Sequence, residues 1–361
     1  MSAYGVALKR RIVSVFRKGG LERLKGGENM FSYVLITPAR DEEAYIGHTL
    51  ESVVNQTVLP TRWVIVDDGS VDQTAAIVAS FAERYPWIQL VQRPRRSKRN
   101  FASKVEAFNA GYACIAGLNY DIICSLDADV SFASDYIEFL LKCFHEDTNL
   151  GVAGTFFRED RYDSSRDSFE GSTHVAGGFQ MFRRQCFEEI GGFVPHEAGG
   201  VDWIAVTTAR MNGWKTRAFR EKSFFHHRTQ GTAQKGAIAA MFGAGQKDYF
   251  LGKHPLPQLL RVLYRMTKKP VGLGGLALLL GYSWTMLLRK KRPITPKLMQ
   301  FRRREDMVKL RRLASAALHR KPVDKFYLLH EEQSDRYAVN TTVDRLATSV
   351  QANRKERTVE R

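Results

Sequence analysis

The sequence has few cysteines, and none of them lies at the spacing of a paired motif. The four cysteines (Cys114, Cys124, Cys143 and Cys186) form no Cys-x-x-Cys arrangement in 361 residues. This argues against a disulfide scaffold or a zinc ribbon and favours a reducing cytoplasm. The 28 glycines and 11 prolines show no Gly-X-Y period, which excludes a collagen-like chain. A hydrophobic content of 44% excludes a largely disordered chain.

The sequence also lacks a long uncharged run. Its most apolar segment, residues 271–288, has 18 residues without a charge, at the lower limit of the roughly 20 residues that a membrane span needs. Lys268 and Lys269 precede it, and four basic residues follow it. Basic flanks on both sides favour a hairpin, a re-entrant helix or a helix lying in the membrane interface. A buried helix packed on the body is the alternative.

Acidic residues are scarce in two segments of the chain, residues 1–29 and 251–320, and the formal net charge of the whole chain is +17. Residues 251–320 hold 17 lysines and arginines but two acids, and residues 1–29 hold seven and two. We therefore expect a basic N-terminal extension (1–29), a near-neutral globular domain (30–250), a basic and apolar membrane-associating helical region (251–320) and a polar tail (321–361). The N-terminus has no signal-peptide pattern. Such a charge favours a polyanionic partner: nucleic acid, phosphates or an anionic membrane surface.

The globular domain alternates strand and helix patterns, which is typical of an α/β fold with a doubly wound, mostly parallel sheet. Strands are expected at 31–37, 63–66, 87–91, 121–126, 150–157, the start of 180–190, 215–219 and 223–227. Helices are expected at 42–55, 72–84, 101–117, the end of 180–190, 202–211 and 234–250. Ligands of such sheets bind beyond the carboxyl ends of the strands.

Acidic clusters follow three of the expected strands, at residues 38–42, 67–68 and 127–129. Acids gathered on one rim repel each other unless a cation or hydrogen-bond donors lie among them. Asp127 and Asp129 are two residues apart, so an extended segment projects both to one side. Mg²⁺ and Mn²⁺ bind such carboxylates together with phosphate oxygens. A turn or a helix N-cap explains the same two acids without a metal.

Two further acidic positions have a structural and a functional interpretation. Asp67 and Asp68 precede Gly69 and Ser70; they belong to a helix-capping turn, or one of them accepts the N3–H of a uracil base. Asp202 follows two glycines, where an aspartate acts as a helix N-cap or as a general base on a reacting hydroxyl.

The sequence His226-His227-Arg228 follows an expected strand. Histidine pairs are often structural, but a neutral imidazole also ligates metals. An adjacent arginine can bind a phosphate with two parallel hydrogen bonds. The residues alone leave both interpretations open.

Taken in order, these segments resemble the family 2 glycosyltransferases. The resemblance covers about residues 31–230 and is strongest to residue 130. It is carried by the following segments: 34–42 (VLITPARDE), 50–57 (LESVVNQT), 64–70 (VIVDDGS) with Asp72 and Thr74, Lys104 with 107–111 (AFNAG), and 127–129 (DAD).

The resemblance implies a GT-A fold with a Rossmann-like nucleotide-binding half (30–130) and an acceptor half (131–250). This fold binds a nucleotide diphosphate-sugar, usually UDP-linked, with Mg²⁺ or Mn²⁺. The residues it places around the donor are Thr37, Pro38, Arg40, Glu42, Asp67, Asp68, Lys104, Asn109 and Asp127. It places Asp129 on the metal, with His226 or His227 completing the shell, and makes Asp202 the catalytic base. Gly177 and Gly178 match the acceptor side. The family often has two acids at the base position, where this chain has Val201 and Asp202.

The resemblance further implies transfer of one hexosyl or N-acetylhexosaminyl unit with inversion. Processive members carry a Gln-x-x-Arg-Trp motif, and this sequence has none. A saccharide or lipid-linked acceptor at the cytoplasmic face of the cell membrane fits the basic, apolar region, with synthesis of cell-surface polysaccharide or glycolipid as the expected role. Nucleic acid is not an expected partner.

Other classes of protein share some of these sequence features. A basic nucleic-acid-binding or membrane-binding protein without catalysis would explain the charge, and nucleic-acid binding would weaken steeply with salt. A scaffold that has lost catalysis would not need acids at every rim position. An NAD-dependent oxidoreductase needs Gly-x-Gly-x-x-Gly after the first strand. That position reads Thr37-Pro38-Ala39-Arg40, which excludes this class.

Overall fold

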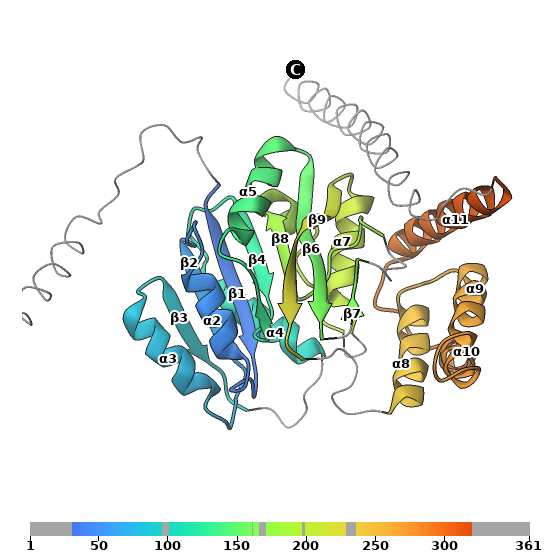
Figure 1. The fold of residues 1–361 in the computed structure, drawn as a ribbon, viewed down its shortest axis with the longest axis horizontal. Coiled ribbons are helices and arrows are strands. Elements are labelled where there is room, and N and C mark those ends of the chain that lie inside the picture. The colour runs from blue at the N-terminus through green and yellow to red at the C-terminus, as the bar shows by residue number, and fades with distance from the viewer. Residues whose placement is uncertain are drawn as a thin grey trace, which may run out of the picture. The chain divides into compact units, whose positions relative to one another are not determined.

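A computed structural model describes residues 31–95, 101–160, 162–165, 171–196, 199–228 and 236–319. The expected basic extension (1–29) and polar tail (321–361) lie outside the described residues. Within the described ranges the chain forms a nine-stranded sheet covered by helices, followed by a helical region (Figure 1).

The first half of the sheet is parallel and carries the carboxyl-end rim. Its strands are β1 (Tyr33–Ala39), β2 (Arg62–Asp67), β3 (Ile88–Gln92) and β4 (Ile122–Leu126), in the order β3-β2-β1-β4. Strands β1, β2 and β4 are buried along nearly their whole length, as expected for a sheet covered on both faces. The α/β fold of GT-A type expected from the sequence is confirmed.

The second half of the sheet is mixed. Its strands are β5 (Val130–Ser131), β6 (Leu150–Glu159), β7 (Tyr162–Asp163), β8 (Phe179–Arg183) and β9 (Lys215–His226). Strand β8 runs antiparallel to both β4 and β6, whereas β6 and β9 are parallel. The two-residue strand β5 pairs antiparallel with the end of β9 and sets Val130 opposite His226.

Alternate residues of β1 pack into two different cores. Tyr33 and Leu35 belong to one apolar cluster, and Val34 and Ile36 belong to another, because successive side chains of a strand point to opposite faces. The first cluster includes residues of α2, α3 and α5, and the second includes residues of α4, α6 and α7. The helices are α2 (Ile46–Val54), α3 (Thr74–Arg84), α4 (Phe101–Cys114), α5 (Tyr136–Glu146), α6 (Arg184–Glu189) and α7 (Val201–Met211). The sheet is therefore doubly wound.

Several elements of the sheet domain differ from the expectation, and β9 and α5 differ most. Residues 215–219 and 223–227 were expected as separate strands, but they form the single strand β9 with an irregularity between them. Thr155 and Phe156 are adjacent on β6, yet they pair with Phe219 and Ser223. Three residues of β9 therefore bulge out of the ladder, and this bulge interrupts the sequence pattern. Helix α5 is the second difference, because the sequence analysis assigned no element there.

The helical region after the sheet contains α8 (Ala237–Phe250), α9 (Pro255–Met266), α10 (Leu273–Leu287) and α11 (Pro296–Leu318). Helix α11 is joined to α7 by the Arg210 guanidinium, which donates hydrogen bonds of 2.9 and 3.1 Å to the two carboxylate oxygens of Glu305. No helix in the described ranges combines the length and the apolarity that crossing a membrane requires.

Glycines bring α8 and α10 unusually close together. A Cβ on Gly281 would clash with the backbone carbonyl of Phe242, and a Cβ on Gly245 would clash with that of Leu278. Backbone atoms of two packed helices cannot shift independently, so the contact depends on the missing side chains.

Gly281→Ala should therefore lower the free energy of unfolding by about 1 to 3 kcal/mol, the usual cost of overpacking. Gly243→Ala on α8 is the matched control, since a Cβ at Gly243 meets no atom within 4 Å. Alanine is the better helix former by about 1 kcal/mol, so the control should be neutral or stabilising. Urea unfolding of both variants measures the difference, and equal stabilities would contradict this description of the helix contact.

Candidate functional site

The register between β5 and β9 brings two distant motifs together. Asp127 and Asp129 lie in the turn between β4 and β5. Because Val130 pairs with His226, the end of β9 lies directly beside this turn. The amide of His227 donates a 2.9 Å hydrogen bond to the carbonyl oxygen of Asp129.

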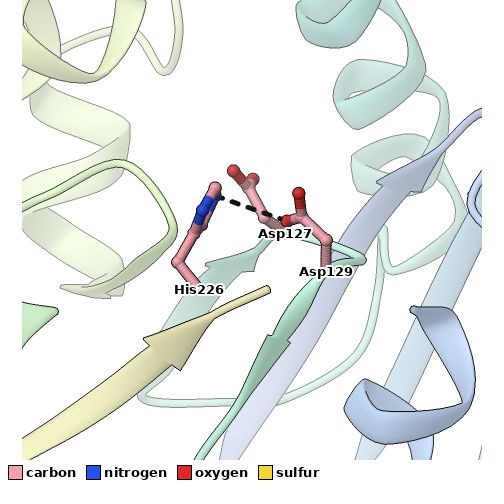
Figure 2. Close-up of side chains that lie close together, drawn as sticks. All are labelled: Asp127, Asp129 and His226. Carbon is pink, nitrogen blue, oxygen red and sulfur yellow. Dashed lines mark ion pairs between the residues drawn. The ribbon is translucent and has the colours of Figure 1, made fainter. Parts of the chain in front are cut away.

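Asp127, Asp129 and His226 present three ligand atoms that lie within 4.8 Å of one another. Figure 2 shows the three side chains converging on one point. His226 Nε2 lies 3.6 Å from Asp129 Oδ1, and both side chains are buried. His226 Nδ1 makes no hydrogen bond among the described residues. Two carboxylates and an imidazole suit Mg²⁺ or Mn²⁺, so the residues fit a divalent metal.

Lys104 on α4 binds one of the two aspartates. Its Nζ lies 2.5 Å from Asp127 Oδ1. Burial and the neighbouring Asp129 raise the pKa of Asp127 although Lys104 acts to lower it. Burial lowers the pKa of Lys104, but Asp127 outweighs it, and the net pKa lies above the ordinary value. Lys104 therefore does not fully offset the effects of burial and of Asp129 on the pKa of Asp127.

Arg228 connects the metal-ligand group to the end of β1. Its Nη2 lies 2.5 Å from Glu42 Oε2, and its Nε lies 3.8 Å from Asp129 Oδ2. The guanidinium also lies over the ring of Tyr45 at 5.6 Å. A cation in this position can bind phosphate oxygens.

The predicted base-reading acids are both buried and both bonded. Asp67 Oδ1 accepts a 3.0 Å hydrogen bond from the amide of Ser70, so Asp67 holds the turn after β2. Asp68 Oδ1 accepts a 2.8 Å hydrogen bond from Arg93, and Arg40 lies 4.0 Å from its other oxygen. Asp67 therefore takes part in the turn, and Asp68 is held by the two arginines.

Thr37 is fully buried at the sheet rim, and its hydroxyl accepts a 2.9 Å hydrogen bond from the indole nitrogen of Trp63. Pro38, the next residue, lines a cleft of about 320 Å³ that also contains Asp127 and His226. The first strand therefore supplies a wall of the cleft through Pro38, while Thr37 fixes the strand to its neighbour.

Asp202 lies in the same cleft, within the first turn of α7. The N-cap of α7 is Gly200, so the interpretation of Asp202 as the N-cap is wrong. Burial acts to raise the pKa of Asp202, but Lys247, His174 and a backbone hydrogen bond lower it below its ordinary value. A helix N-terminus also favours negative charge. Asp202 is therefore ionised at neutral pH, the form that a general base requires.

Gly177 leaves the space in which Asp202 lies. A Cβ at Gly177 would lie 2.9 Å from Asp202 Oδ2, so a larger residue there would move the carboxylate. Gly178 likewise lies against the ring of Phe224, and its carbonyl accepts a 2.9 Å hydrogen bond from the amide of Asp127.

Two further expected residues, Asn109 and His227, lie outside the cleft. Asn109 is exposed and does not line the cleft; it lies five residues after Lys104, which is about 140° around the helix. His227 points away from His226 because neighbours on a strand alternate. Its Nε2 lies 2.9 Å from Ser131 Oγ, and its ring stacks on that of His48 at 4.6 Å.

Several residues of the site were missed by the sequence analysis. Glu159 Oε1, at the end of β6, lies 3.7 Å from His226 Nδ1. Lys247 reaches the cleft from α8, and Arg93 binds Asp68. No local motif marks any of them. Only the pairing of the end of β6 with the end of β9, which the structure shows, identifies Glu159.

Comparison with known proteins finds a family match over part of the chain. Residues 34–200 match the model of the family described as "Glycosyl transferase family 2". The match covers 167 of the 361 residues, and over them the chain is similar to this family. The resemblance seen in the sequence is thus confirmed, and the glycosyltransferase match contains β1 to β4 together with the Asp127–Asp129 turn.

Relatives of this glycosyltransferase domain cover part of the chain. A probable glycosyltransferase, YdaM, from Bacillus subtilis is 33% identical over 127 residues, which are 34% of this chain and 29% of that protein. The 4,4'-diaponeurosporenoate glycosyltransferase of Staphylococcus aureus is 31% identical over 128 residues, which are 34% of this chain and 31% of that protein. The match to each therefore spans less than a third of the relative's length.

Among solved structures, the glycosyltransferase domain and its helical region are similar to the mannosyltransferase PcManGT from Pyrobaculum calidifontis, solved in complex with GDP-Man and Mn²⁺. The TM-score is 0.49 at 18% identity, and the match covers 94% of each chain.

Proposed function

We propose that this protein is a glycosyltransferase that moves one sugar from a nucleotide diphosphate-sugar to an acceptor hydroxyl. The observation that carries the proposal is one cleft that holds Asp127 and His226 of the metal-ligand group together with the ionised Asp202. The family match supports the same activity. The donor we propose is UDP-linked, with a hexosyl or N-acetylhexosaminyl unit.

The donor would lie along the carboxyl ends of β1, β2 and β4. Pro38 borders it, and Asp67 or Asp68 reads the base from the turn after β2. Lys104 and Arg228 each bind an acid now, and both are positioned to bind sugar or phosphate oxygens when the donor enters. A divalent cation on Asp127, Asp129 and His226 would offset negative charge on the diphosphate when bound.

Asp202 is the base in the proposed mechanism. Its carboxylate accepts the proton of the acceptor hydroxyl while that oxygen forms a bond to the anomeric carbon. The bond from this carbon to the diphosphate oxygen breaks, and its electron pair leaves with the diphosphate. Attack opposite the leaving group inverts the anomeric configuration. A positioned base of this kind contributes about 10² to 10⁴ in rate.

The acceptor we propose is a saccharide or a lipid-linked saccharide, reached by an enzyme that is peripheral to the cytoplasmic face of the membrane. The basic and apolar helical region supports this location. One of the relatives is named a 4,4'-diaponeurosporenoate glycosyltransferase and another a chondroitin synthase. Synthesis of cell-surface polysaccharide or glycolipid is the role we propose.

Nucleotide-dependent thermal stability tests the proposal. We expect UDP with Mn²⁺ or Mg²⁺ to raise the Tm, because a ligand at 100 times its Kd contributes about 2.7 kcal/mol to stability. UDP without metal, and GDP, CMP or NAD with metal, serve as controls. A larger shift with GDP would keep the enzyme class but contradict the assigned base. No response to any nucleotide, with salt-sensitive binding to nucleic acid instead, would overturn the proposed activity.

A further inference from the structure

Helices α9 and α10 each expose a stripe of large apolar side chains. On α9 the stripe is Leu256, Leu259, Leu260 and Leu263; these positions follow the spacing of one helix face. On α10 the exposed positions are Leu273, Leu276, Leu280, Trp284 and Leu287. The two helices contact each other, and they lie next to one another in Figure 1. Scattered exposed leucines are ordinary, but two adjacent stripes mark an interaction surface.

Basic residues border the apolar stripes at both ends of α10. Lys268 and Lys269 lie in the turn from α9, and Arg289, Lys290 and Lys291 follow the last turn of α10; all five are exposed. Residues 255–292 contain no aspartate or glutamate. Exposed leucines and a tryptophan beside unopposed cations match a lipid surface with anionic headgroups.

The length of α10 sets its orientation on such a surface. Its 15 residues extend about 22 Å, less than the roughly 30 Å hydrocarbon core of a bilayer. Basic clusters at both of its ends also favour an orientation in which both ends reach headgroups. A helix lying in the plane of the interface satisfies both conditions.

We propose that the exposed stripes of α9 and α10 form one docking surface for an anionic lipid bilayer, on which both helices lie flat. This surface specifies how the protein would bind the membrane at the location proposed above. Its role in catalysis rests on the proposed function. A second copy of the chain is the weaker alternative, because a symmetric contact through this surface would set the same cations against each other.

Helix α8 connects this docking surface to the cleft. Gly245 of α8 packs against the backbone of α10, and Lys247, two residues later, lines the cleft with Asp202. The close helix contact leaves little freedom between the docked helices and this wall of the cleft. The cleft would therefore lie at a fixed distance from the membrane surface that holds the acceptor.

Sedimentation of the full chain with vesicles tests the docking surface. We expect binding to phosphatidylcholine vesicles that contain phosphatidylglycerol, and much weaker binding to phosphatidylcholine alone. The double variant Leu276→Glu/Leu280→Glu should weaken binding to the anionic vesicles at least tenfold. Both leucines are exposed, at 44% and 51%, so the fold should tolerate the change. The matched control is Leu59→Glu/Val71→Glu, which adds the same charge at exposed positions of the nucleotide-binding half.

Quenching of Trp284 by brominated lipids reports its depth, with Trp284→Phe as the reference. Strong quenching is expected, and none would overturn the flat orientation. Equal sedimentation of both double variants would overturn the surface assignment. A wild-type dimer that dissociates in the Leu276→Glu/Leu280→Glu variant, without vesicle binding, would assign the surface to a second copy. Nucleotide-dependent stability of the same variants should be unchanged, so loss of docking and failure of the proposed enzyme activity are distinguishable.

Discussion

Asp202→Asn should reduce sugar transfer by about 10² to 10⁴ fold, the contribution of a positioned general base, while nucleotide-sugar binding persists. Asparagine has nearly the same shape as aspartate, so the packing of this side chain against Gly177 is retained. The amide cannot accept the proton of the acceptor hydroxyl. The loss should therefore fall on kcat, with little change in the donor concentration that stabilises the protein.

Product formation from a labelled UDP-sugar measures the first quantity, and thermal stabilisation by UDP with Mn²⁺ measures the second. Asp135→Asn is the matched control, because Asp135 is an exposed acid whose ion pair with Lys222 lies at the surface. Such pairs contribute little to stability. If Asp202→Asn lost donor binding and transfer in equal measure, Asp202 would be a donor ligand and not the base.

Asp129→Asn should remove most of the metal-dependent part of nucleotide binding. At a ligand concentration of 100 Kd, this removes up to about 2.7 kcal/mol of stabilisation. The neutral amide is a weaker ligand for a divalent cation than a carboxylate. It also relieves the repulsion with Asp127, so the free protein should be at least as stable as the wild type. Titration with Mn²⁺ at fixed UDP, followed by Tm, gives the comparison.

The adjacent histidines provide an internal control for the metal site. His226→Ala should lose the metal response as Asp129→Asn does, since His226 completes the group of three ligand atoms. His227→Ala should keep it, because His227 stacks on His48 outside this group. The reverse result, or an unchanged metal dependence in Asp129→Asn, would contradict the ligand assignment.

The parallel half of the fold was predictable because its signals are local. Each of the strands β1, β2 and β4 is a short apolar run that ends in polar residues, and a run of that kind is buried wherever the sheet is covered on both faces. The clustering of Asp67, Asp68 and Asp127 at one rim followed from strand direction alone. The fold class and the acidic rim of the sheet were therefore available from the sequence.

The remaining part of the site was less predictable because it depends on pairing between distant segments. A two-residue strand, β5, determines that His226 and not its neighbour meets Asp129, and no propensity reveals so short a strand. The bulge in β9 hid the continuity of that strand. Lys247 reaches the cleft from α8, which begins after the sheet is complete. Its position follows from helix packing through Gly245 and Gly281, and helical periodicity cannot show which neighbour a helix will have.

The match to the family ends at residue 200, yet Asp202, His226 and Lys247 lie beyond it. The cleft is thus lined both by residues inside the matched segment, such as Asp127, and by residues outside it. Substitutions in the second group can change the shape and charge of the cleft while the four parallel strands stay intact. Variants at positions after residue 200 are accordingly the place to alter the cleft without disturbing the half of the sheet that forms its rim.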